Sequence, residues 1–189
     1  MSLPRYNPHY TLSDYQQWEG SWELWHGVAV AMTPSPFGIH QWLSGRFAHQ
    51  IIQQCQDQRC LDCHVLQEVD WILQEDLVVR PDLSVVCGRL PERFISETPA
   101  LIIEILSEST RDKDKRWKAD LYAERGVRYY AIVDPWSWDC VVYGLHDGDY
   151  EAMDSSSPLT IHDGCALQLR MPHRPNTDDP ADEALDHRH

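Results

Sequence analysis

Two acidic residues lie in apolar, β-type segments, where an ionised carboxylate needs a partner. Asp82 lies within residues 77–86, and Glu104 lies within residues 100–106. Apolar neighbours cannot replace the hydration that a carboxylate loses on burial. Two such acids on neighbouring strands would also repel each other unless a cation lay between them. Mg²⁺ suits that place because it is a hard ion that binds one or two carboxylates and keeps several waters.

A simpler explanation exists for each acid alone. Either carboxylate could pair with an arginine or a lysine, and Asp82 could serve the turn that follows Pro81. The two acids together, followed by a cation-rich helix, have the order of parts found in a metal-dependent nuclease site. We therefore treat the pair as a candidate metal site.

A helix that is rich in basic residues is predicted from about Arg111 to Arg125. Ser and Thr residues at 107–110 offer N-terminal caps, and Gly126 ends the segment. Lys115, Lys118 and Tyr122 are spaced three and four residues apart, so they share one helix face. A lysine above two metal-binding acids could orient a water or stabilise charge on a phosphoryl group. The alternative is an ordinary solvated helix, which is the better explanation for Lys115.

The remaining pattern alternates strands and helices. The strand that carries Glu104, the helix after it and a strand over residues 129–133 form a predicted right-handed crossover unit. Hydrophobic periodicity and turn residues predict the other elements. They are a short helix at 11–18, a strand at 22–32, a helix at 38–56, a hairpin of strands 64–73 and 77–87, and a hairpin of strands 140–145 and 150–153.

Length and composition favour one domain over residues 1–171, followed by an acidic, disordered tail over 172–189. No run of about 18 apolar residues could cross a bilayer, and residues 1–6 lack the apolar stretch of a secretory signal. These features predict a cytoplasmic protein with no membrane partner.

The formal net charge of -14 argues against general affinity for nucleic acid, because duplex binding draws on clustered Lys and Arg. Residues 111–128 differ from the rest, since they hold seven basic and four acidic residues, a net charge of +3. A local basic face is therefore compatible with the composition.

Six cysteines raise a separate question. The run from Cys60 through Cys63 to His64 has the spacing of a c-type haem attachment site, and it also suggests zinc. Haem attachment needs an exported chain, and zinc would need a second pair of ligands, whereas Cys87 and Cys165 stand singly in the sequence. We therefore predict reduced intracellular thiols and no structural disulfide.

Several motifs in order resemble the Uma-two family of restriction-endonuclease-like proteins, which belongs to the PD-(D/E)xK nuclease superfamily. The resemblance covers roughly residues 10 to 170. The motifs are Trp22-Glu23-Leu24 with Gly27, Met32-x-Pro34 with His40, Pro81-Asp82, Glu104-Ile105-Leu106-Ser107 followed by Ser109-Thr110, Lys118-Ala-Asp-Leu-Tyr122, Gly126-Val127 and Tyr129-Tyr130-Ala-Ile-Val-Asp134-Pro135.

The resemblance implies an α/β restriction-endonuclease-like fold, in which helices flank a central mixed β-sheet. It further implies that the chain hydrolyses phosphodiester bonds of nucleic acid, DNA in the first place, with Mg²⁺ or Mn²⁺ as cofactor, and that it could act as a homodimer. The resemblance implies that Asp82 and Glu104 are metal ligands, that Lys118 is the catalytic lysine, and that Glu23 and His40 line the site. The backbone carbonyl of Ile105 is a further candidate ligand, and the helix face adds Lys115 and Tyr122 as candidate lining residues.

The chain departs from the superfamily pattern two positions after Glu104, where Leu106 replaces the usual lysine. The catalytic lysine would then come from the helix, either as Lys118 or as Lys115. Two other functions stay open. One is a non-catalytic relative that acts as a nucleic-acid-binding or regulatory module, and the other is a haem or metal protein built on Cys60, Cys63 and His64.

Overall fold

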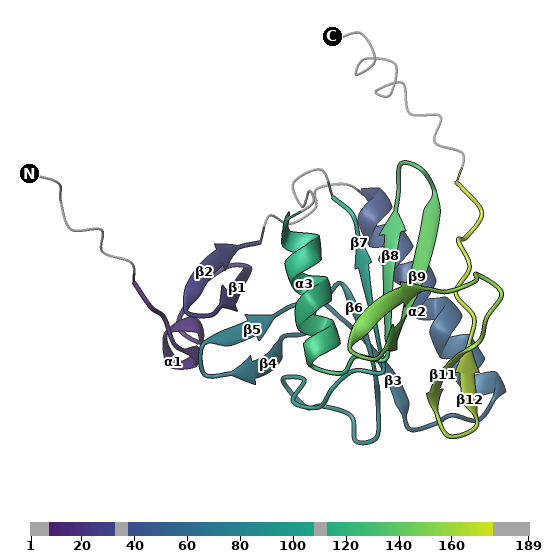
Figure 1. Cartoon of the computed structure of the whole chain (residues 1–189), viewed down its shortest axis with the longest axis horizontal. Helices are drawn as coiled ribbons and strands as arrows, with labels where there is room; N and C mark the ends of the chain where they lie inside the picture. Colours follow the sequence, from purple (N-terminus) through teal and green to yellow (C-terminus); the bar gives the residue numbers. More distant parts are fainter. Residues whose placement is uncertain (1–7, 33–37, 108–112, 176–189) are drawn as a thin grey trace, which may run out of the picture.

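The computed structural model describes residues 8–32, 38–107 and 113–175 (Figure 1). Within these residues lie three helices and three β-sheets. The helices are α1 (Leu12–Tyr15), α2 (Gly38–Asp57) and α3 (Lys113–Glu124). The strands of the largest sheet are β3 (Cys63–Gln67), β6 (Leu83–Cys87), β7 (Leu101–Ile105), β8 (Tyr129–Asp134), β9 (Asp139–His146) and β10 (Asp149–Ala152). A four-stranded sheet contains β1 (Trp22–Trp25), β2 (Val28–Ala31), β4 (Trp71–Gln74) and β5 (Leu77–Val79), and a hairpin contains β11 (Leu159–His162) and β12 (Cys165–Leu167).

The large sheet is mixed, with the strand order β10-β9-β8-β7-β6-β3. Strands β7 and β8 are parallel, and every other neighbouring pair in this sheet is antiparallel. The predicted crossover unit is confirmed, because α3 connects the two parallel strands. This α/β architecture is the predicted restriction-endonuclease-like fold.

The two faces of the large sheet have separate cores, because successive strand residues point to opposite faces. On one face α2 contributes Phe47 and Ile51, which pack in a cluster with Ile103. On the other face α3 contributes Leu121 and Tyr122, which cluster with residues of β7, β8 and the four-stranded sheet. The face covered by α3 is therefore the one that Glu104 shares with its neighbour Ile102.

Three predicted strands are wrong in their extent. Residues 22–32 form a hairpin, not one strand, because His26 and Gly27 adopt positive φ angles of 48° and 79° and reverse the chain. The predicted strands at 64–73 and 77–87 each divide between the two sheets. The parts next to the turn, β4 and β5, pair as the expected hairpin. The parts farther from the turn, β3 and β6, pair with each other in the large sheet.

The chain bends sharply between β5 and β6. Pro81 has no backbone N–H, so it cannot continue a strand ladder. The residue before a proline is also restricted to extended conformations. Arg80 and Asp82 flank this bend, at which the chain passes from the four-stranded sheet to the large sheet. The bend places Asp82 directly before β6.

The cysteine prediction is wrong for four of the six residues. Cys60 forms a disulfide with Cys165, and Cys63 forms one with Cys87. The free thiols of Cys55 and Cys140 agree with it. The bonded pairs are 105 and 24 residues apart in sequence, so spacing gave no sign that they meet.

The β11–β12 hairpin was not predicted, and it covers the face of the sheet that also holds α2 (Figure 1). The predicted caps at 108–110 and the tail beyond residue 175 lie outside the described residues. No helix in the described ranges is long and apolar enough to cross a membrane.

Candidate active site

Asp82 lies at the junction of the two sheets and faces the end of β7. Its Oδ2 atom accepts a hydrogen bond of 2.7 Å from the backbone N–H of Ile105. The ladder pairs Leu83 with Ile103, so the next step along the two strands places Asp82 beside Glu104. The two predicted metal ligands are therefore neighbours, as the sequence indicated.

Glu104 points from β7 toward α3. Its Oε1 atom accepts hydrogen bonds from Tyr122 Oη at 2.7 Å and from Lys118 Nζ at 3.2 Å. Both donors lie on one face of α3, because they are four residues apart. The helix thus places a cation and a phenol directly against the carboxylate.

Glu23 completes the surroundings of the lysine from the other sheet. It lies on β1, and only 2% of its surface is exposed. Its Oε1 atom lies 3.0 Å from Lys118 Nζ and accepts a 2.7 Å hydrogen bond from the Arg80 backbone N–H. Its Oε2 atom accepts a 2.8 Å hydrogen bond from Trp25 Nε1. Lys118 therefore bridges one carboxylate of each sheet.

Burial dominates the electrostatics of this cluster. Burial raises the pKa of Glu104 to about 7, Lys118 opposes this rise, and the Asp82 charge adds to it. Burial alone would lower the pKa of Lys118, but Glu104 and Glu23 outweigh it and hold that pKa above its usual value. The lysine is therefore charged at neutral pH, and Glu104 titrates in the physiological range.

His40 joins the site from the third residue of α2. Its Nε2 atom lies 3.3 Å from Asp82 Oδ2, and 6% of the residue is exposed. Burial lowers the pKa of His40, but Asp82, Glu68 and the Ile105 backbone together raise it above its usual value. Its Nδ1 atom is buried without a hydrogen-bond partner among the described residues. The imidazole therefore approaches the Asp82 carboxylate through Nε2.

Of the eight residues predicted for the site, the structure gathers seven in one cluster: Asp82, Glu104, Ile105, Lys118, Tyr122, Glu23 and His40. The side chain of Lys115 lies outside the described residues. Trp25 and the N–H of Arg80, which hold Glu23, were missed. The contact between Trp25 and Glu23 could have been predicted from the sequence, because residues two apart on a strand point to the same face.

The donor set fits a hard divalent ion in type and in number. Asp82 and Glu104 supply carboxylates, and Mg²⁺ is held by one or two such groups together with water. In the state that the structure shows, with four cysteines bonded in pairs, no set of three or more His, Cys, Asp or Glu side chains across the described ranges is arranged to hold a metal ion. A bound ion would therefore rest on the two acids and on backbone or solvent oxygens.

A pocket of about 560 Å³ lies on another side of α3 and takes in none of these residues. Its lining includes Arg116 and the ring residues Tyr130, Tyr143 and Tyr150. The candidate site and this pocket are therefore separate features of the same helix.

Comparisons with known proteins agree with the sequence patterns. The model of the Uma2 family, described as "Putative restriction endonuclease", matches residues 12–170. A putative nuclease of DUF820 from Anabaena variabilis ATCC 29413, known from a crystal structure, aligns with a TM-score of 0.64 and 18% identity, covering 82% of this chain and 90% of its own. The DrdV–DNA complex aligns with a TM-score of 0.32 and 12% identity, covering 61% of this chain and 12% of that one. No curated protein matches. The family match spans most of the chain, and the chain belongs to the Uma2 family of putative restriction endonucleases.

Proposed function

We propose that this chain is a metal-dependent nuclease that hydrolyses phosphodiester bonds of nucleic acid, with DNA as the first substrate to test. The observation that carries the proposal is the convergence of Asp82, Glu104 and Lys118 at one junction between the two sheets. A fold built only for stability would gain little from three charges that are largely shielded from water, because desolvation offsets most of their attraction.

Asp82, Glu104 and the Ile105 carbonyl would hold Mg²⁺ or Mn²⁺, and such an ion lowers the pKa of a bound water and offsets charge on phosphorus. Lys118 presents its ammonium group beside Glu104 and would donate hydrogen bonds to the attacking water or to a phosphate oxygen. Glu23 and Tyr122 have positioning roles, since each fixes one partner of this pair. His40 would hold the Asp82 carboxylate, since its Nε2 atom lies 3.3 Å from Asp82 Oδ2.

The alternative is a non-catalytic binding or regulatory module. The net charge of -14 favours it, and so does the occupation of Glu104 Oε1 by two protein donors. The two functions differ in one measurable respect, because only the nuclease requires a divalent ion to convert a substrate.

Mg²⁺ or Mn²⁺ is expected to raise the melting temperature and to be required for cleavage. An ion that binds only the folded state adds about 2.7 kcal/mol at 100 times its Kd. Asp82→Asn should remove most of the thermal shift and all of the cleavage. Both are measured by thermal melting and by gel assays of labelled DNA and RNA, with metal and with a chelator.

Asp120→Asn is the matched control, because Asp120 is an exposed acid on α3 outside the site. It should keep the metal response of the unmodified chain. A thermal shift that survives in both Asp82→Asn and Glu104→Gln would remove the metal assignment. A normal metal response without cleavage of any substrate would favour the non-catalytic module.

Binding to nucleic acid is expected to be weak and local, because the +3 segment at 111–128 is the basic region of an acidic chain. Each neutralised phosphate adds roughly 0.9 to the slope of log affinity against log salt for duplex DNA, so the slope should be shallow. Titration of short single- and double-stranded DNA and RNA, with Ca²⁺ and with a chelator, measures it. Binding should weaken on chelation, and a steep slope that is independent of metal would contradict this model.

A further inference from the structure

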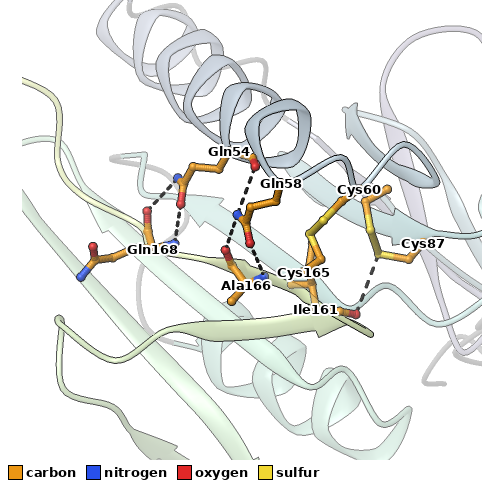
Figure 2. The surroundings of a disulfide bond; sticks show 9 residues. Gln54, Gln58, Cys60, Cys87, Ile161, Cys165, Ala166 and Gln168 are labelled. Carbon is orange, nitrogen blue, oxygen red and sulfur yellow. Dashed lines mark hydrogen bonds between the residues drawn. A yellow bond between two sulfur atoms is a disulfide. The ribbon is translucent and has the colours of Figure 1, made fainter.

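Four cysteines from three separate segments meet at the end of the molecule that is remote from the candidate active site. Cys63 is the first residue of β3. Cys60 lies in the connection before it, Cys87 ends β6, and Cys165 begins β12 (Figure 2). Asp82 precedes the other end of β6, about 16 Å away by the rise of an extended strand. The cluster therefore has no part in the chemistry proposed above.

The backbone holds the two bonded pairs next to each other. Cys63 N–H donates to the Cys60 carbonyl at 3.3 Å, which closes a turn between the two residues. Cys63 lies directly opposite Cys87 in the β3–β6 ladder, with Cα atoms 4.1 Å apart. Cys60 and Cys165 have Cα atoms 5.9 Å apart. The turn thus joins one cross-strand pair to one pair that reaches the β11–β12 hairpin.

Contacts other than sulfur–sulfur bonds keep the hairpin in this place. Gln54 on α2 exchanges two hydrogen bonds with the backbone of Gln168, at 2.8 and 3.0 Å. Gln58 does the same with the backbone of Ala166, at 2.7 and 3.0 Å (Figure 2). Cys165 is also fully buried in the core on this face of the sheet. The four sulfur atoms would therefore stay together when both disulfides are reduced.

A Cys-x-x-Cys pair joined by two further cysteines is the ligand set of a closed structural zinc site. The sequence offered only the first pair, and the tertiary structure supplies the second. While bonded in pairs, the sulfurs offer no thiolate, and metal binding by cysteine requires the thiolate. The redox state of the four cysteines therefore decides whether they are ligands.

We propose that the reduced chain binds one Zn²⁺ ion through Cys60, Cys63, Cys87 and Cys165, and that the two disulfides are its oxidised form. A dithiol reductant supplies four electrons and four protons and converts the two disulfides to four thiols, while the reductant is oxidised to two disulfides of its own. Zinc binding then releases the four thiol protons. The ion ties the α2–β3 connection and the β11–β12 hairpin to the central sheet.

The test uses the full chain, purified with reductant and zinc and then freed of unbound metal by gel filtration. Elemental analysis should find one zinc per chain. Cobalt added to reduced, zinc-free protein should give the thiolate-to-metal charge-transfer band and the visible bands of a tetrahedral site. Oxidation with diamide should release the metal and lower the mass by four hydrogens relative to the reduced, metal-free chain. A reduced chain that binds neither zinc nor cobalt overturns the proposal.

Cys87→Ser should lose the zinc, whereas Cys140→Ser should keep it, because Cys140 is a free cysteine on β9 outside the cluster. Asp82→Asn should also keep it, which separates this site from the metal proposed for catalysis. Zinc that stays bound in Cys87→Ser, or that is lost in Asp82→Asn, assigns the ion elsewhere and overturns the proposal. If Cys87→Ser does not fold, the cobalt spectrum of the unmodified chain decides, because a site without sulfur ligands gives no thiolate charge-transfer band.

Discussion

Lys118→Ala is expected to lower the free energy of unfolding by roughly 3–5 kcal/mol at pH 8, the cost of removing one partner from a buried ion pair. Lys118 Nζ lies 3.0 Å from Glu23 and 3.2 Å from Glu104, and 13% of its side chain is exposed. Without the ammonium group, no cation lies between Glu23 and Glu104 in the metal-free protein, and the pKa of Glu104, already raised by burial, rises further because Lys118 no longer lowers it. Urea denaturation measures the loss, and cleavage should be abolished as well.

Two variants check this reasoning. Arg116→Ala lies on an exposed part of the same helix and should stay within about 0.5 kcal/mol of the unmodified chain. The double variant Lys118→Ala/Glu104→Gln should recover part of the stability, because it removes one of the two stranded charges. A Lys118→Ala protein that is as stable and as active as the unmodified chain would show that the lysine is neither a buried counter-ion nor catalytic. Lys115 would then be the next residue to test, since Lys115→Ala is expected to have little effect.

Glu104→Gln is expected to raise the free energy of unfolding of the metal-free protein at pH 8, and it should also abolish cleavage. Burial raises the pKa of Glu104 to about 7 from an ordinary value of 4.5. The folded chain therefore binds a proton more tightly than the unfolded chain does. The stabilisation from this tighter proton binding by Glu104 is full below pH 4.5 and is lost as the pH rises to about 7. At pH 8, Gln should make the metal-free protein more stable by on the order of 3 kcal/mol.

The pH profile separates this effect from other changes. Unfolding free energies of the two proteins should agree near pH 4.5 and diverge up to about pH 7, after which the difference stays constant. Burial lowers the pKa of His40 and Asp82 raises it above the usual value, but this holds in both proteins and drops out of the difference. Parallel profiles across the whole range would contradict a buried, ionising Glu104.

Much of the candidate site could be predicted from local sequence. Asp82 and Glu104 stand out because apolar segments seldom carry a carboxylate without a reason, and Lys118 and Tyr122 follow from helical spacing. The role of Glu23 could not be predicted in this way. The role of Glu23 depends on the bend at Arg80, whose backbone N–H donates to the Glu23 carboxylate. It also depends on Lys118, which contacts Glu23 on β1 of one sheet and Glu104 on β7 of the other.

The strand boundaries failed for a related reason. Residues 64–73 and 77–87 each read as one extended run, because hydrophobic alternation reports which side chains are buried and not which sheet buries them. Only the packing of two sheets at the Pro81 corner divides each run into two strands.

The sequence by itself determined the α/β class, the crossover unit and the identity of the buried acids, because these depend on residue type and on spacing within one segment. The tertiary structure alone decided the meeting of Cys60 with Cys165 and of Cys63 with Cys87, and the bridge that Lys118 makes between Glu23 and Glu104. Each of these joins segments that are distant in the chain. Contacts of this kind depend on how faces pack together, and local periodicity carries no information about which distant faces will meet.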